Sequence, residues 1–341
     1  MESRGTIGEG VQVNSVGRTV RFLLVSFALD LTQVRSTPKV ITDNEGRCIV
    51  IFIGGPTRDD TWRDVVKAAA ATMASVRQEG VVAGLLPKDV QSHRRGEFVA
   101  LPVGVSHGNG RLKPGNLYHP PERVKLIQRL LDDPSIKRIT SYQSSVFSYY
   151  APKLYAQYCR NLLRVFEHDE SLQRNFKGSV FPAASFNLGP ATVSIDHTDA
   201  GNVGYGLCAL ASLGSFDSRR GGHLILFDMG LFVEFPAGTV ALLPSGILRH
   251  GNTTLQAGEE RCSIAQYCAG GLLRWVQYGC QTAVSIRNSF TKAKAKEVLA
   301  SLDGVHEDRV REALQLFSKV DELDSDRSEI YKDFATFLKE D

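Results

Sequence analysis

The hydrophobic pattern divides the chain into a helical first part, a strand-rich middle and a helical end. Residues 48–53 form a short apolar run closed by a Gly-Gly-Pro turn, which predicts a buried strand. Helices are expected where apolar residues recur at helical spacing, in segments 61–80, 121–131 and 151–168. In the first segment Thr61 is the expected N-cap and Gly80 the expected end.

From residue 180 to about 278 the pattern changes to short β-type runs separated by turns that contain glycine. The expected strands are 181–188, 191–197, 204–212, 223–227, 231–235, 239–243 and 261–269. About eight short strands at this spacing are typical of a jelly roll or double-stranded β-helix. We therefore expect an α+β fold in which a double-stranded β-helix (jelly-roll) core is flanked by N-terminal and C-terminal helices.

The same pattern predicts the domain boundaries. Residues 1–38 are expected to form an N-terminal arm, because their first half is rich in Gly, Ser and polar residues. The main domain is expected over 39–290, with its jelly-roll core at about 180–280 and its helical support at 60–168. A C-terminal helical segment, 291–341, completes the chain.

Composition sets only loose bounds on function. The 341 residues are 43% hydrophobic and 23% charged, which is ordinary for a globular protein. A net charge of +3 is compatible with a polyanionic partner but does not require one. Six cysteines without a C-x-x-C pair indicate reduced thiols in an intracellular protein. The apolar run 22–31 is too short to cross a bilayer, so we expect a buried strand and no membrane association.

The strongest chemical signal is His197-Thr198-Asp199, at the end of an expected strand, together with the distant His250. Side chains two residues apart on a strand point to the same face, about 7 Å apart along the backbone. Two histidines and one carboxylate form the facial triad that holds non-haem Fe(II) and leaves coordination positions open. The alternative is a surface His-Asp pair and an unrelated loop histidine.

A second H-x-D sequence, His306-Glu307-Asp308, serves as an internal control. It lies at the start of an expected helix, where residues two apart point in nearly opposite directions. We therefore assign it to helix-start electrostatics and not to metal binding.

The expected strand 261–269 carries the candidate co-substrate site. Arg261 and Ser263 lie on one face of this strand, and an inward arginine in a jelly roll needs an anionic partner. A carboxylate of 2-oxoglutarate, bound in a bidentate manner by Arg261 and by the Ser263 hydroxyl, would be that partner. The alternative is a solvent-facing Arg261 paired with Glu259 or Glu260.

Aligned on these residues, the stretch 186–278 resembles the ten-eleven translocation / J-binding-protein family of Fe(II)- and 2-oxoglutarate-dependent nucleic-acid oxygenases, above all its fungal branch. The matching motifs are His197-Thr198-Asp199-Ala200-Gly201-Asn202, Gly221-Gly222-His223-Leu224, Pro236-Ala237-Gly238-Thr239, His250-Gly251-Asn252 and Arg261-Cys262-Ser263 through Tyr267 to Gly270-Gly271. A weaker match extends over 107–116.

The resemblance implies roles for the site residues. His197, Asp199 and His250 would be the metal ligands and catalytic centre, while Arg261 and Ser263 would bind 2-oxoglutarate.

For the substrate, the resemblance implies that Asn202 hydrogen-bonds a flipped base and that Tyr267 stacks on it. Arg111 and Asn116, in the weaker match, are further expected substrate contacts. Ala269 replaces a base-reading histidine of the animal members, so the preferred base stays open between 5-methylcytosine and N6-methyladenine.

These observations predict a dioxygenase that oxidises the methyl group of a methylated base in duplex DNA by base flipping, with O2 as co-substrate. We expect a monomer, and a nuclear location follows only from the inferred substrate. Phosphate contacts are expected from Arg111 and Lys113 and from the basic pairs Arg94-Arg95, Lys137-Arg138 and Arg219-Arg220. Two alternatives stay open: an oxygenase of the same chemistry acting on protein or small molecules, and an inactive nucleic-acid-binding scaffold.

Overall fold

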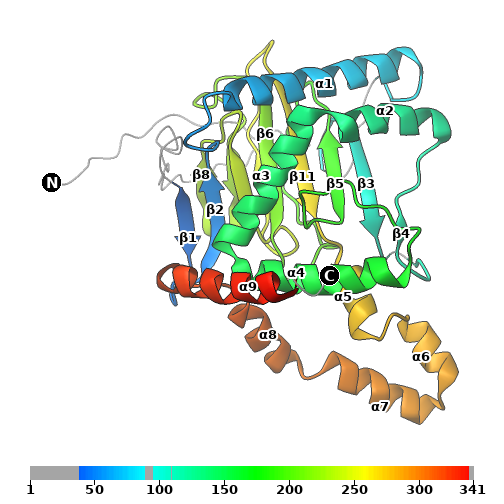
Figure 1. The fold of residues 1–341 in the computed structure, drawn as a ribbon. Coiled ribbons are helices and arrows are strands. Elements are labelled where there is room, and N and C mark those ends of the chain that lie inside the picture. The colour runs from blue at the N-terminus through cyan, green and yellow to red at the C-terminus, as the bar shows by residue number, and fades with distance from the viewer. Residues whose placement is uncertain (1–37, 89–94, 109, 338–341) are drawn as a thin grey trace.

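The computed structural model describes residues 38–88, 95–108 and 110–337, and Figure 1 shows them as a mixed α and β structure. The expected arm 1–38, the apolar run 22–31 and Arg94 lie largely or wholly outside the described residues. The fold is α+β with a jelly-roll-type core, as the sequence predicts.

Antiparallel strands build two sheets. The strands are β1 (Lys39–Thr42), β2 (Cys48–Ile53), β3 (Ala100–Ser106), β4 (Gly115–Asn116), β5 (Ala183–Asn187), β6 (Cys208–Ser215), β7 (Leu224–Leu226), β8 (Leu231–Val233), β9 (Val240–Leu243), β10 (His250–Asn252) and β11 (Glu260–Tyr267). The helices are α1 (Trp62–Val82), α2 (Pro121–Asp132), α3 (Pro134–Tyr150), α4 (Pro152–His168), α5 (Gly270–Gln277), α6 (Ala283–Ser289), α7 (Lys292–Asp303), α8 (His306–Gln315) and α9 (Leu323–Phe337).

The larger sheet is wider than the sequence pattern indicates. Its order is β1-β2-β9-β6-β11-β5-β3-β4, and the smaller sheet has the order β10-β7-β8. Strands β1 to β4 come from residues 39–116, which precede the stretch 180–280 where the jelly-roll core was expected. β3 escapes a search for alternating strands because Pro102 and Gly104 interrupt its apolar positions.

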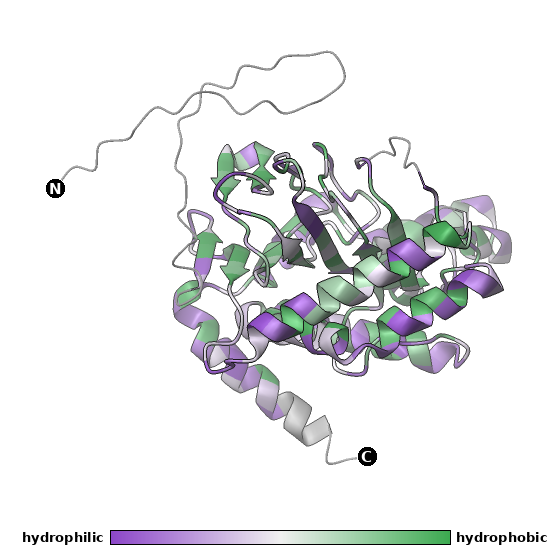
Figure 2. Ribbon diagram, turned by 90° about the horizontal axis from the view of Figure 1, so that it is seen from above, coloured by the Kyte–Doolittle hydropathy of each residue, from purple (hydrophilic) through white to green (hydrophobic). Residues whose placement is uncertain are grey.

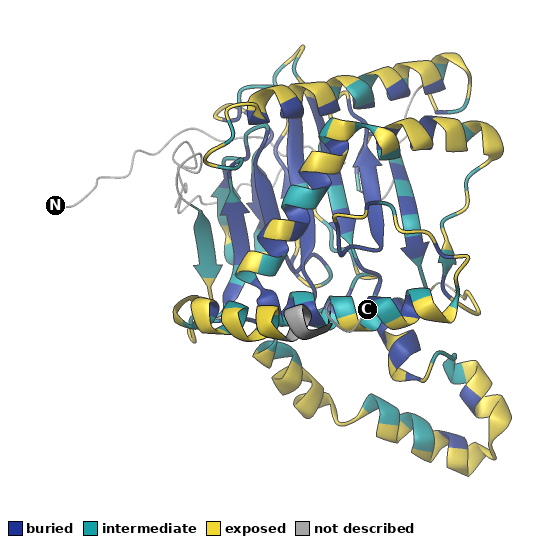
Figure 3. Ribbon diagram, in the orientation of Figure 1, coloured by how far each residue is buried: buried dark blue, intermediate teal, exposed yellow. Residues whose placement is uncertain are grey.

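Helices cover one face of the larger sheet, and the smaller sheet covers the other. Figure 1 shows α1, α2 and α3 in front of the larger sheet and α4 across its lower end. Figure 3 shows the strands largely buried and the outer faces of the helices exposed. The helices in front carry both hydrophilic and hydrophobic residues (Figure 2), as expected for elements with one buried face. Between the sheets, Phe52, Leu226 and Phe235 belong to an apolar core.

Helix α1 shows why a local stop signal failed. Gly80 does not end this helix, which continues to Val82. A Cβ at Gly80 would lie 2.5 Å from Leu86 Cδ1, so glycine is needed there for close packing. The expected N-cap Thr61 makes no side-chain capping bond, and its hydroxyl bonds Asp59 instead.

Helix α3 was not expected, although its start signal is present. The Asp133 carboxylate accepts a hydrogen bond from the Ile136 backbone N–H at 2.9 Å, and Pro134 occupies the first helical turn. The buried face of α3 includes polar side chains such as Gln143 and Ser144, which weaken the apolar periodicity.

Segment 191–197 departs from the expected strand. It pairs only through isolated bridges, at Ala191, Ser194 and His197. Towards the C-terminus the expected helices are present, and α8 begins at His306 as predicted for the second H-x-D sequence. No helix within the described residues is long and apolar enough to cross a membrane.

Candidate metal centre and co-substrate pocket

The H-x-D segment and β10 are held together by main-chain hydrogen bonds. The His197 N–H donates to the His250 carbonyl at 3.1 Å, and the His250 N–H donates back to the His197 carbonyl at 2.9 Å. The Asp199 N–H donates to the Ser245 carbonyl at 2.8 Å. This pairing brings together residues that are far apart in the sequence.

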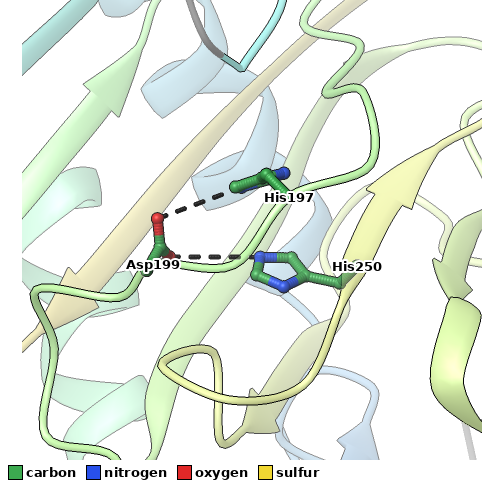
Figure 4. A group of neighbouring side chains, drawn as sticks. All are labelled: His197, Asp199 and His250. Atoms are coloured by element: carbon green, nitrogen blue, oxygen red, sulfur yellow. Dashed lines mark ion pairs between the residues drawn. The ribbon is translucent and has the colours of Figure 1, made fainter.

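The three side chains point toward one another, as Figure 4 shows. His197 Nε2 lies 3.9 Å from Asp199 Oδ1, and His250 Nε2 lies 4.0 Å from Asp199 Oδ2. Ligand atoms of the three residues all lie within 4.8 Å of one another. In the part of the chain that the structure describes, this is the group of His, Cys, Asp and Glu side chains spaced to hold a metal ion.

Hydrogen bonds fix the proton positions of both imidazoles. His197 Nδ1 lies 2.7 Å from the Ile195 carbonyl oxygen, and His250 Nδ1 lies 2.9 Å from the Leu248 carbonyl oxygen. A carbonyl only accepts, so each Nδ1 carries the proton and each Nε2 presents a lone pair. Both lone pairs therefore face the Asp199 carboxylate, and this is the arrangement of an oriented metal ligand.

The donor set fits a divalent transition metal. With metal–ligand bonds of about 2.1 Å, neighbouring ligands of an octahedral site lie about 3 Å apart. The observed separations of 3.9 and 4.0 Å exceed this by about 1 Å, which small side-chain rotations can close. Two neutral imidazoles and one carboxylate on one side of the ion are the ligands that non-haem Fe(II) takes, with the opposite side open.

The pKa of His197 is lowered to about 4, first by burial and then by the neighbouring His250. At neutral pH the imidazole is thus uncharged, the form that binds metal. Because this folded-state pKa lies below the ordinary value of 6.5, protonation favours the unfolded chain as the pH falls.

We therefore expect the free energy of unfolding of the metal-free protein to fall as the pH is lowered from 6.5 to about 4. Below that pH the contribution of His197 should stay constant. Urea unfolding across this range measures the loss. His197→Gln should flatten the pH dependence, whereas His306→Gln, at an exposed histidine, should leave it as in the original protein. If the free energy of unfolding depends on pH equally in both variants, His197 is not the group responsible for the loss of stability.

Arg95 was expected to contact phosphate, but the structure places it at the metal centre. Its Nη1 lies 3.3 Å from Asp199 Oδ1. The pair is only partly buried, with the Arg95 side chain one third exposed, so it contributes little to stability. Arg95 instead affects the electrostatics of the site, because its positive charge compensates the negative charge of Asp199, as a bound metal ion would.

Arg261 is the most unusual buried side chain of the pocket. It is 1% exposed, and its Nη1 donates to the Thr192 carbonyl at 2.7 Å and approaches Asn252 Oδ1 at 3.4 Å. Its Nε and Nη2 are buried without a hydrogen-bond partner. Burial lowers the pKa of Arg261 only to about 10, so the guanidinium stays charged at neutral pH.

No carboxylate pairs with this charge among the described residues, and the alternative partners are occupied elsewhere. Glu259 accepts from the Asp217 N–H at 2.8 Å, and Glu260 lies 3.9 Å from Arg77. An unpaired buried guanidinium is costly, and the Nε and Nη2 of Arg261 are donors available to an anionic ligand. A carboxylate that accepts two parallel hydrogen bonds fits these two donor atoms.

Ser263 lies beside Arg261 on the same face of β11. Its oxygen accepts a hydrogen bond from Asn187 Nδ2 at 2.9 Å, which leaves the hydroxyl proton available to a ligand. One cavity, with about 40 Å³ of free space, is lined by the three candidate metal ligands His197, Asp199 and His250 and by Arg261 and Ser263. Arg95 also lines the cavity and is its most exposed charged side chain.

The expected base contacts lie close to this cavity. The Asn202 N–H donates to the Asp199 carbonyl at 2.8 Å, and Asn202 Nδ2 donates to Ser245 Oγ at 3.0 Å. The charges of Arg95 and Asp199 act on Tyr267, whose pKa burial raises to about 12. Its hydroxyl is therefore neutral. Neither Asn202 nor Tyr267 is among the residues that line the metal cavity.

Ala269 is buried, with 6% of its surface exposed, in the apolar core cluster that includes Tyr158 and Leu272. Its backbone bridges Asn202. A histidine at this position would place an imidazole in an apolar environment, so Ala269 is a packing residue in this chain.

The expected substrate contacts Arg111 and Asn116 lie outside the lining of the metal cavity. Arg111 is exposed, and its Nη1 approaches the Gly115 carbonyl at 3.4 Å. Asn116 donates to the Ser171 carbonyl at 2.9 Å and accepts from the Gln173 N–H at 3.0 Å, so its amide secures β4 to the following loop.

Several of the expected phosphate contacts are instead paired with carboxylates. Lys113 lies 2.9 Å from Asp169, and Lys137 lies 3.3 Å from Asp132. The remaining pairs are Arg138 with Asp59 and Arg219 with Asp217. Ion pairs of this exposed kind belong to a solvated surface.

Sequence reasoning missed the polar residues that orient Arg261. Thr192 binds the guanidinium through its backbone carbonyl, which no side-chain pattern reveals. Asn187 and Asn252 were not singled out, although Asn252 follows His250 by two residues and so shares its face of β10. The two-residue spacing from His250 could therefore have identified Asn252 as a site residue.

No family model matches the chain, and no curated protein matches it. Among solved structures, the chain is similar to NgTET1 in complex with 5mC DNA, at 14% identity over 69% of this chain and 78% of that chain, with a TM-score of 0.47. It is also similar to an oxidoreductase of the 2OG-Fe(II) oxygenase family from Burkholderia pseudomallei, at 16% identity over 66% of this chain and 86% of that chain, with a TM-score of 0.36. Both likenesses concern the fold alone.

Proposed function

We propose that this protein is an Fe(II)- and 2-oxoglutarate-dependent dioxygenase that oxidises the methyl group of a methylated base in DNA. The observation that carries the proposal is the convergence of two imidazole Nε2 atoms and one carboxylate beside the buried Arg261, whose Nε and Nη2 have no hydrogen-bond partner among the described residues. A purely structural site would not leave a buried guanidinium without an anion.

In this proposal His197, Asp199 and His250 hold the iron, and Arg261 with Ser263 binds the distal carboxylate of 2-oxoglutarate. Bound iron, together with 2-oxoglutarate and O2, would supply the oxidant for a methyl C–H bond, chemistry that amino-acid side chains lack. The chain itself orients both groups.

The walls of the cavity limit access by water. Apolar residues Phe98, Leu210 and Leu224 line it together with the donor atoms. A low-dielectric wall strengthens the interaction between Arg261 and a bound carboxylate. It also keeps a reactive centre from being quenched by solvent.

The DNA substrate is the finer part of the proposal and rests on the resemblance of 186–278 to nucleic-acid oxygenases. A methyl group in duplex DNA cannot reach a buried metal, so the base has to leave the stack, at a cost of a few kcal/mol. Stacking on Tyr267 would return about 1–3 kcal/mol of this cost. Asn202, beside Asp199, is the proposed hydrogen-bonding partner of the base. The proposed nuclear location follows from this substrate.

The deciding experiment is mass spectrometry of duplex oligonucleotides that carry 5-methylcytosine or N6-methyladenine, incubated with the protein, Fe(II) and 2-oxoglutarate. We expect a gain of one oxygen atom on one of the two bases, or loss of the N-methyl group after such a gain. Omission of 2-oxoglutarate should abolish the product. Consumption of 2-oxoglutarate with protein or small-molecule substrates but no change in either oligonucleotide would instead favour an oxygenase of another substrate class.

A further inference from the structure

A second and larger cavity lies next to the metal centre, on the other side of the turn that carries Asp199. It has a volume of about 560 Å³ and lies between α4, α5, α8 and the loop 202–205. A volume of this size is in the range of pockets that hold small organic ligands. Asn202 lines this cavity, and its N–H donates to the Asp199 carbonyl at 2.8 Å, so a single turn separates the two sites.

Three helices each contribute an arginine to the cavity, namely Arg164 from α4, Arg274 from α5 and Arg309 from α8. None of the three forms an ion pair or a side-chain hydrogen bond with another described residue. Glu312 is the one carboxylate of the lining, so the cavity carries an excess of positive charge. Guanidinium groups that converge from separate elements without carboxylate partners suit a phosphate group.

The floor of the cavity has a different chemistry. Val203, Leu273 and Val276 line it and are nearly fully buried, at 4%, 8% and 8% exposure. Such a surface accommodates a flat apolar face. Gln157 also lines the cavity, and its Oε1 is buried without a hydrogen-bond partner among the described residues, so it can accept from an N–H or O–H donor.

We propose that this cavity binds a nucleotide, with its base on the apolar floor and its phosphate against Arg164, Arg274 and Arg309. An exocyclic amine or a ribose hydroxyl is a suitable donor to Gln157 Oε1. The nucleotide can belong to a nucleic-acid chain or be free in solution. The first source rests on the proposed function, because the cavity adjoins Asp199 and would then hold a nucleotide next to the one being oxidised.

The test measures binding by metal-free protein, so that it does not depend on catalysis. The probes are a fluorescent single-stranded oligonucleotide and an unmethylated duplex, both by anisotropy, and adenosine and cytidine monophosphates by calorimetry. The variant is Arg164→Gln/Arg274→Gln/Arg309→Gln. Its control, Arg63→Gln/Arg160→Gln/Arg287→Gln, removes the same charge from exposed arginines that do not line the cavity.

We expect the cavity variant to bind oligonucleotide at least about tenfold more weakly than the control. The slope of log Kd against log salt should also fall by about 0.7, since a single phosphate lies at the three arginines and each lost phosphate contact removes about that much for a single strand. Loss of monophosphate binding alone would support the free nucleotide as the source. If neither probe distinguishes the cavity variant from its control, the proposal is wrong.

A second variant separates the cavity from a merely basic surface. Ala313→Trp adds no charge and fills the cavity from α8, where Ala313 is half-buried. It should weaken binding of the same probe as the arginine variant does. Unchanged binding by Ala313→Trp, with circular dichroism showing an intact fold, would exclude the cavity. Failure of the proposed function has another signature, because the original protein would then bind these probes but oxidise no methylated oligonucleotide.

Discussion

Replacing Arg261 with methionine is expected to abolish 2-oxoglutarate binding and, at the same time, to make the ligand-free protein more stable. The guanidinium is 1% exposed, and its buried Nε and Nη2 have no hydrogen-bond partner within the part of the chain that the structure describes. Removing one partner of a buried charge pair costs about 3–5 kcal/mol, or roughly 10²- to 10³-fold or more in affinity. Replacing an uncompensated buried charge by an apolar side chain of similar length is instead stabilising by about 1–4 kcal/mol.

Two measurements check this expectation. Calorimetry with 2-oxoglutarate on the Mn(II)-loaded protein reports binding, and thermal unfolding of the metal-free protein reports stability, where a rise of a few degrees is expected. Arg287→Met, at an exposed arginine, controls for the loss of one positive charge. A destabilised Arg261→Met that still binds 2-oxoglutarate would mean that Arg261 is a structural residue.

Replacing His197 with alanine is the second change with a large expected effect. The site would keep only Asp199 and His250, and two ligands cannot hold the metal on one face. We expect Mn(II) affinity to fall by more than about a hundredfold, since even residues that only orient metal ligands are worth about 10–100-fold. Oxidised oligonucleotide should fall below detection. The thermal shift that Mn(II) produces in the original protein should disappear.

The chain supplies its own control for this experiment. His306 opens the second H-x-D sequence, where α8 begins, and no third ligand accompanies it in the described part of the chain. His306→Ala should therefore leave the Mn(II) shift and the product unchanged. If Mn(II) still raises the unfolding temperature of His197→Ala but no longer raises that of His306→Ala, the metal binds at the C-terminal H-x-D sequence. That result would contradict the proposed function.

Local patterns were enough for several strands of the two sheets. Strands β5, β7, β9 and β11 fall within or close to their expected segments because alternation is a property of a few consecutive residues. The same alternation placed Arg261 and Ser263 on one face, and the structure has both lining one cavity. Proline and aspartate before α3 gave a comparable signal that polar residues on its buried face obscured.

Long-range pairing had no such signal. Strands β2 and β3 join the sheet through partners far away in the sequence, because β2 pairs with β9 and β3 pairs with β5 across some eighty residues (Val103 with Ala184). Arg95 reaches Asp199 across a similar interval. Neither contact depends on a repeating pattern, so periodicity cannot reveal it.

By itself, the sequence determined which side chains are available for chemistry and which of them share a strand face, because backbone geometry repeats every two residues. Tertiary structure alone decided that His250 approaches His197 and Asp199, that both imidazoles present Nε2, and that Arg261 lacks a carboxylate. It also decided that three arginines from separate helices meet in one cavity. These outcomes depend on antiparallel pairing and helix packing between remote segments. Because an unpaired polar atom costs free energy when it is buried, each such atom indicates a place where a ligand can bind.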